Sequence, residues 1–147
     1  MTSNRFYPYF LVTIQLGSLL YIAISGPVIS NNIAGLLVES VGIFLAVHAI
    51  YIVKIRNVNV TPTVKKGSEL VTSGPYRIIR HPMYIAQLIA VLPLVIDYFS
   101  WYRLAAIIIL LLVLLIKIGY EEKQLIAHFP EYTKYKTTTS RLIPYIY

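Results

Sequence analysis

Residues Phe6 to Val38 read FYPYFLVTIQLGSLLYIAISGPVISNNIAGLLV, and this stretch holds no charged side chain. Over the whole chain of 147 residues, 57% of the residues are hydrophobic and 13% are charged, against about 25% charged residues in an average soluble domain. A soluble domain of this length cannot bury so much apolar surface, which indicates that lipid surrounds it. We therefore predict an all-α integral membrane protein that forms a single domain over residues 1–147.

Four apolar segments follow one another along the chain, at about residues 8–25, 33–53, 82–96 and 102–120. The first two match a hydrocarbon core of roughly 30 Å, whereas the third covers only about 22 Å. The third segment therefore either spans a locally thinned bilayer or pairs with the fourth as a tight hairpin. The first segment lacks a clear small-residue cleavage site, so we expect a membrane helix there rather than a cleaved signal peptide.

The basic residues predict how these segments are oriented. Most lysines and arginines fall in two stretches, residues 54–80 and residues 117–141. Because such residues gather on the cytoplasmic side of membranes, we predict four spans with both termini in the cytoplasm, followed by a C-terminal interfacial helix. The net charge of +7 then reflects topology and attraction to anionic lipids rather than nucleic-acid binding.

The polar stretch LVTSGPYRIIRHPMY (Leu70–Tyr84) lies directly before the third apolar segment. Gly74-Pro75 predicts a turn, because glycine supplies backbone freedom and proline fixes its own φ. Pro82 suits the first turn of a helix, whose N-terminus favours a carboxylate or a phosphate. The stretch indicates a site for a charged small molecule at the membrane surface, although arginines here are also typical of ordinary membrane anchors.

Glu121 and Glu122 follow Tyr120, where we expect the fourth segment to end. Carboxylates at a helix C-terminus oppose the helix dipole, and anionic lipids repel them. A bound cation would compensate for both effects. Alternatively, the glutamates begin a separate surface helix that runs to about His128 and pair with neighbouring lysines. The chain has no cysteine and its acidic and histidine residues match no ligand spacing, so we expect no metal site.

Three blocks of sequence give the C-terminal half a family resemblance: GPYRIIRHPMY (74–84), EEKQLIAHFPEYTKYK (121–136) and RLIPY (141–145). In this order, with one helical hairpin between the first two blocks, they resemble the isoprenylcysteine carboxyl methyltransferases. The phospholipid methyltransferases and many small prokaryotic membrane methyltransferases are relatives of that family. The resemblance implies S-adenosylmethionine as the cofactor, a helical-hairpin scaffold over residues 1–56, and a cofactor-binding and catalytic part over residues 57–147.

The resemblance also assigns roles to particular residues. Glu121 would bind the ammonium group of the cofactor, and Lys117 takes the place of a basic residue, usually arginine, that faces the methyl acceptor. Arg141 is a second cation that could steer an acceptor carboxylate. The family's Phe-Gly is Phe129-Pro130 here. The implied cofactor-binding residues are a strand-like stretch with mainly backbone contacts (Ser68, Glu69, Leu70 and Val71) together with Tyr76, His81, Pro82, Met83, Tyr84 and Glu121.

The implied reaction is an in-line transfer of a methyl group to a lipid-like or prenylated acceptor, in which the protein mainly aligns the reactants and excludes water. A carboxylate, as in an isoprenylcysteine, needs only an orienting cation, and this is the acceptor we favour. A phospholipid amine must be free of its extra proton, and Glu122 becomes relevant as a base in that case. A sterol-reductase-like enzyme with a nicotinamide cofactor and a non-catalytic membrane scaffold are the alternatives. We expect a prokaryotic cytoplasmic membrane protein, surrounded by lipid, whose site faces the cytoplasm.

Overall fold

The computed structural model describes residues 6–57, 67 and 69–147, so Ser68 lies outside the described residues. Within these ranges the chain is all-helical and forms no strand, which confirms the predicted all-α class. The elements are α1 (Phe6–Ile24), α2 (Ile33–Asn57), the short 3-10 helix η1 (Gly74–Arg77), α3 (Pro82–Asp97), α4 (Trp101–His128) and α5 (Tyr132–Thr138).

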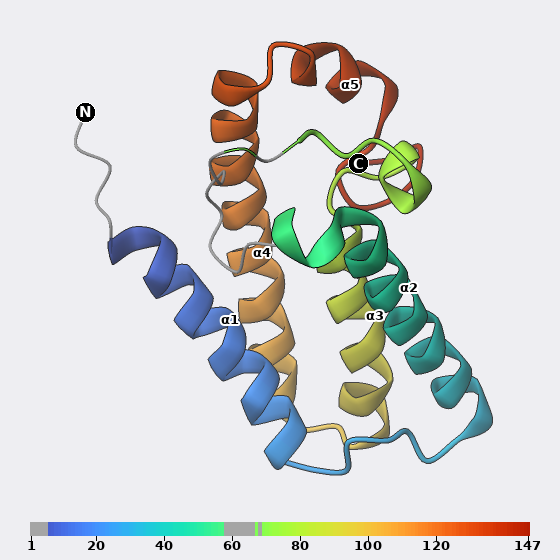
Figure 1. Cartoon of the computed structure of the whole chain (residues 1–147). Helices are drawn as coiled ribbons and strands as arrows, with labels where there is room; N and C mark the ends of the chain where they lie inside the picture. The colour runs from blue at the N-terminus through green and yellow to red at the C-terminus, as the bar shows by residue number, and fades with distance from the viewer. Residues whose placement is uncertain (1–5, 58–66, 68) are drawn as a thin grey trace.

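The four long helices run alternately up and down (Figure 1). The connections from α1 to α2 and from α3 to α4 lie at one end of the bundle, and η1, α5 and the C-terminal residues lie at the other (Figure 1). We call the second of these the α5 end. In this arrangement α2 packs along α3 and α1 packs along α4.

Gly42 lets the backbones of α2 and α3 lie close together. A β-carbon at this position would lie 2.6 Å from the backbone nitrogen of Ala90 and 2.9 Å from the backbone oxygen of Ala86. Small residues of this kind let helix backbones approach closely in membranes. Helices α2 and α3 are therefore packed through backbone contacts at Gly42.

A polar network fastens the two connections at the opposite end of the bundle. The carboxylate of Asp97 accepts hydrogen bonds from three groups within Ser30–Asn32, including the backbone N–H of Asn31 at 2.8 Å. The buried Arg103 donates to the backbone oxygen of Leu94 at 2.7 Å and to the hydroxyl of Ser25 at 3.0 Å. These bonds hold the ends of all four long helices together, so the helices reach the α5 end in a fixed arrangement.

Three helices of the described part are long and apolar enough to cross a membrane: α1, residues Ile33–Val53 of α2, and α4. The chain is thus a membrane protein, as its composition predicts. Helix α3 is apolar but shorter, with 16 residues. Its full passage across the bilayer, the side on which the termini lie and the interfacial position of α5 stay predictions, as does the division at residue 56.

The predicted end of the fourth segment is wrong. Helix α4 continues past Tyr120 to His128, so there is no separate surface helix that begins at Glu121. The uncharged part of the segment ends at Ile116, but most residues after Gly119 are good helix formers, and Glu122 is buried against other elements. The two glutamates therefore lie about two turns inside a helix and do not oppose its C-terminal dipole.

The predicted strand-like stretch is also not observed. Its described residues, Glu69 to Val71, have no regular secondary structure. No neighbouring strand pairs with them among the residues that the structure covers, and a lone extended segment has no ladder to stabilise it.

The predicted topology can be tested with single cysteines, because the natural chain contains none. Trp101 and Lys134 are both exposed and lie near opposite ends of the bundle. In intact cells, an impermeant maleimide should label Trp101→Cys and should spare Lys134→Cys until the membrane is permeabilised. Labelling of both variants from the same side would contradict the four-span topology.

Candidate active site

The turn predicted at Gly74-Pro75 is the 3-10 helix η1, with Pro75 in its first turn. Gly74 has a φ of 59°, in the left-handed region that favours glycine. This turn packs Tyr76 against apolar residues of α2 and buries it. Burial raises the pKa of the Tyr76 phenol far above its ordinary value, so its hydroxyl stays protonated. No residue that the structure describes makes a hydrogen bond with this buried hydroxyl.

The segment between η1 and α3 is held by the C-terminal segment. The backbone N–H of Arg80 donates to the oxygen of Ser140 at 2.8 Å, and that of His81 donates to the oxygen of Arg141 at 3.1 Å. Helix α3 then begins at Pro82, in the position that the sequence predicts, with His81 as its N-cap residue. The side chains of Arg80 and His81 therefore project from a backbone that is fixed on both sides.

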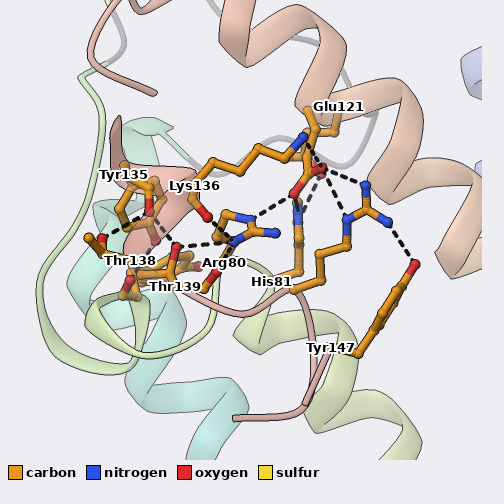
Figure 2. A network of polar contacts seen from close by, with 11 residues as sticks. Arg80, His81, Glu121, Tyr135, Lys136, Thr138, Thr139 and Tyr147 are labelled. Atoms are coloured by element: carbon orange, nitrogen blue, oxygen red, sulfur yellow. Dashed lines mark hydrogen bonds and ion pairs between the residues drawn. The ribbon is translucent and has the colours of Figure 1, made fainter. Parts of the chain in front are cut away.

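Glu122 joins three parts of the chain at the α5 end. Its carboxylate lies 2.7 Å from Nε of Arg80, 3.2 Å from Nη2 of Arg141 and 3.9 Å from Nζ of Lys136. Arg80 also donates to the backbone oxygens of Lys136, at 3.1 Å, and Thr139 (Figure 2). Glu122 is almost fully buried, and a buried carboxylate needs nearby cations to compensate its charge. These cations come from the segment directly before α3 and from the C-terminal part of the chain.

Glu121 has different surroundings. Its side chain is 30% exposed and accepts a hydrogen bond from the hydroxyl of Tyr84 at 2.9 Å. Nδ1 of His81 lies 3.7 Å from Glu121, and Nε2 of the same ring lies 3.7 Å from Glu122, so the imidazole stands between the two carboxylates. The rings of His81 and Tyr84 stack with their centroids 5.5 Å apart. Glu121 is thus a positioned carboxylate that solvent, or a ligand, can still reach.

Lys117 lies one helical turn before Glu121 on α4 and is buried, with 1% exposure. Its Nζ donates to Oε1 of Gln15 on α1 at 2.5 Å and lies 5.2 Å from the centroid of the Tyr84 ring. Nε2 of Gln15 in turn donates to Oε1 of Gln87 on α3 at 2.7 Å. Neither glutamine is predicted from the sequence, because isolated amides in apolar segments match no motif.

The structure brings five of the predicted site residues together at the α5 end: Tyr76, His81, Tyr84, Lys117 and Glu121. Arg141 lies at the edge of this cluster, where it also donates to the hydroxyl of Tyr147 at 2.7 Å. Val71 and Met83 pack against the apolar cluster that contains Tyr76, and Pro82 is buried at the start of α3. The described part of the chain holds no group of three or more acidic, histidine or cysteine residues that could bind a metal ion.

The bundle also carries an apolar groove on its surface. It has a volume of about 290 Å³ and lies between residues Ile85–Leu92 of α3 and Ile107–Leu111 of α4. Only apolar atoms line it. Ile85 follows Tyr84 directly in the sequence, but the lining residues do not include any member of the polar cluster.

Comparison with known proteins gives one family match. The model of the phospholipid methyltransferase family matches residues 30–132, which is more than half of the chain. The matched region contains Tyr76, His81, Tyr84, Lys117 and Glu121, whereas α1 precedes it. No curated protein matches the chain.

Proposed function

The chain belongs to the phospholipid methyltransferase family and is therefore a membrane methyltransferase, and we propose that Tyr84, Lys117 and Glu121 mark where it binds S-adenosylmethionine and a lipid-like methyl acceptor. The observation that carries this proposal is the meeting of the reachable carboxylate of Glu121 and the buried ammonium group of Lys117 at the ring of Tyr84. Membership in the family sets aside the nicotinamide-dependent reductase and the non-catalytic scaffold considered from the sequence.

The described residues fit the polar groups of S-adenosylmethionine. The carboxylate of Glu121 suits its ammonium group, and Tyr84 holds that carboxylate in place. Tyr76 adds a buried hydroxyl that lacks a hydrogen-bond partner in the part of the chain described, and Nδ1 of His81 lies 3.7 Å from the carboxylate of Glu121. Pro82, Met83 and the stretch Glu69–Val71 line the same region in this proposal. When bound, the cofactor supplies a methyl group that is already activated on a sulfonium centre.

The ion pairs of Glu122 support a carboxylate, rather than an amine, as the methyl acceptor. A protonated amine must first lose a proton, and Glu122 is a poor base because Arg80 and Arg141 stabilise its charged form. A carboxylate needs no base, only a cation that orients it. Lys117 provides that cation one turn from Glu121. We therefore propose carboxyl methylation of an isoprenylcysteine-type acceptor.

Methylation of a phospholipid amine is the second candidate, and the description of the matching family favours it. The two candidates differ in the stability of their products. Carboxyl methyl esters hydrolyse in alkali and release volatile methanol, whereas an N-methyl group keeps its carbon–nitrogen bond and stays non-volatile even when alkali cleaves the acyl esters of the lipid.

To distinguish the two acceptors, the purified protein is placed in vesicles that contain either S-farnesylcysteine or phosphatidylethanolamine. Methyl-labelled S-adenosylmethionine is then added. We expect label in S-farnesylcysteine that becomes volatile after alkali treatment. Label from the phosphatidylethanolamine vesicles that stays non-volatile after alkali would contradict carboxyl methylation and establish the second candidate.

We propose that the hydrocarbon chain of the acceptor lies in the groove between α3 and α4. Leu88→Trp should fill the groove and displace about two methylene groups of that chain, which lowers kcat/KM for the acceptor by roughly tenfold. The dissociation constant of S-adenosylmethionine should not change. Leu37→Trp makes the same change on the exposed face of α2 and is the matched control. Equal kcat/KM values for the two variants would show that the groove does not bind the acceptor.

A further inference from the structure

A chain of polar side chains crosses the interior of the bundle between three helices. Lys117 of α4, Gln15 of α1 and Gln87 of α3 are linked by two hydrogen bonds, of 2.5 Å and 2.7 Å. Lys117 and Gln15 are both buried, with 1% and 7% exposure. Polar groups inside a membrane helix bundle are costly unless they are paired, and they commonly serve a function.

The second hydrogen bond determines how the first one is made. Nε2 of Gln15 donates to Oε1 of Gln87, which turns Oε1 of Gln15 toward the ammonium group of Lys117. The reverse orientation of the amide would place its two N–H donors against a cation. Gln87 therefore selects the orientation of Gln15 that can accept a hydrogen bond from Lys117.

The position of the Lys117 ammonium group matters because of what lies beside it. Its Nζ stands 5.2 Å from the centroid of the Tyr84 ring, and the hydroxyl of that ring is bonded to Glu121. A lysine side chain has four rotatable bonds and does not by itself hold its nitrogen in one place. The bond to Gln15 keeps the nitrogen on the Tyr84 side of α4.

We propose that Gln15, oriented by Gln87, is a positioning residue that holds the ammonium group of Lys117 beside Tyr84, so that α1 completes the acceptor side of the site. Helix α1 precedes the region that the family model matches, so the match itself assigns it no role. The inference rests on the proposed role of Lys117 as the cation that orients the acceptor.

A Gln15 that only satisfies the buried ammonium group of Lys117 would stabilise the protein as much as a Gln15 that positions this group for the acceptor. A measurement of stability alone therefore does not separate the structural role from the positioning role. The variants are Gln15→Met, which removes the acceptor oxygen, and Gln15→Glu, which keeps an oxygen that can face Lys117. Ser18→Ala is the matched control, because Ser18 is a buried polar residue one turn further along α1. If Gln15→Met does not fold, Gln87→Leu takes the place of that variant in every measurement, because it frees the amide of Gln15 to rotate.

The first readout is methyl transfer to S-farnesylcysteine or phosphatidylethanolamine, whichever the parent protein methylates. Gln15→Met should lower kcat/KM for the acceptor by about 10- to 100-fold, as expected for a lost hydrogen bond to a charged group. The dissociation constant of S-adenosylmethionine should stay within about twofold of the parent value, and Gln15→Glu should recover most of the activity. An equal loss of cofactor affinity, or a Gln15→Met variant as active as Ser18→Ala, would overturn the proposal.

The second readout combines Gln15→Met with Lys117→Met. If Gln15 acts through Lys117, adding Gln15→Met to Lys117→Met should change kcat/KM by less than about twofold. Effects of the two substitutions that multiply would show that Gln15 acts through another group and would overturn the proposal.

The third readout does not depend on activity. A succinimidyl ester should label Lys117 slowly in the parent protein and several-fold faster in Gln15→Met, with the exposed Lys123 as the internal reference. Unchanged labelling of Lys117 would overturn the positioning role. If the parent methylates neither acceptor, the proposed acceptors are wrong, and the labelling result still decides whether Gln15 holds Lys117.

Discussion

Glu121→Gln should lower the affinity of the protein for S-adenosylmethionine, and for its demethylated product S-adenosylhomocysteine, by about 30-fold or more. Both ligands carry the same ammonium group, and removing one partner of a desolvated charge pair commonly costs about 2–5 kcal/mol. The substitution keeps the shape of the side chain and an oxygen that can accept the hydrogen bond from Tyr84. Isothermal titration of both ligands measures the effect.

Glu131→Gln is the matched control, because Glu131 is an exposed acid outside the cluster. It should bind both ligands as the parent protein does. Since Glu121 lies inside α4 rather than at its end, we expect Glu121→Gln to change the free energy of unfolding by less than about 1 kcal/mol. Equal affinities of Glu121→Gln and the parent protein would remove Glu121 from the cofactor site.

Arg80→Met should cause the largest loss of stability among the substitutions at the α5 end. It leaves the buried carboxylate of Glu122 without its closest cation, and breaking a buried ion pair in this way costs about 3–5 kcal/mol. The substitution also removes the hydrogen bonds to the backbone oxygens of Lys136 and Thr139. For a chain of this length the midpoint of thermal unfolding should fall by roughly 6–20 °C. Circular dichroism of the protein in detergent measures this midpoint.

Two further variants show whether the buried pair is the cause. Arg77→Met removes a neighbouring exposed arginine and should leave the midpoint nearly unchanged. The double variant Arg80→Met with Glu122→Leu removes both charges, so no unpaired carboxylate stays buried and much of the stability should return. The same midpoint for Arg77→Met and Arg80→Met would contradict the structural role of the pair.

The apolar parts of the helices could be predicted because each helix carries its own signal. Pro82 begins α3 as its position in the sequence indicates, and Ile33 begins α2. The end of α4 could not be predicted in the same way, because its uncharged run ends at Ile116 while the helix continues to His128. Its last turns are stabilised in part by the pairing of Glu122 with residues of other segments, and that pairing exists only in the folded chain.

The residues of the candidate site could also be predicted only in part. Tyr76, His81, Tyr84 and Glu121 lie in blocks of sequence that resemble a known family, so they could be identified, and the structure brings them together. The partners that hold these residues carry no such signal. Gln15 is 102 residues from Lys117 and Arg80 is 42 residues from Glu122, so only the packing of the helices brings each pair into contact.

The most direct test of the central claim is the transfer of a labelled methyl group from S-adenosylmethionine into lipid. Vesicles that contain the purified protein and both S-farnesylcysteine and phosphatidylethanolamine are supplied with the labelled cofactor at a concentration below saturation, and the organic extract is counted. We predict that the parent protein transfers label into the extract and that Glu121→Gln transfers about 30-fold less, in line with its weaker binding. Equal transfer by both proteins, or no transfer by the parent above vesicles without protein, would contradict the account.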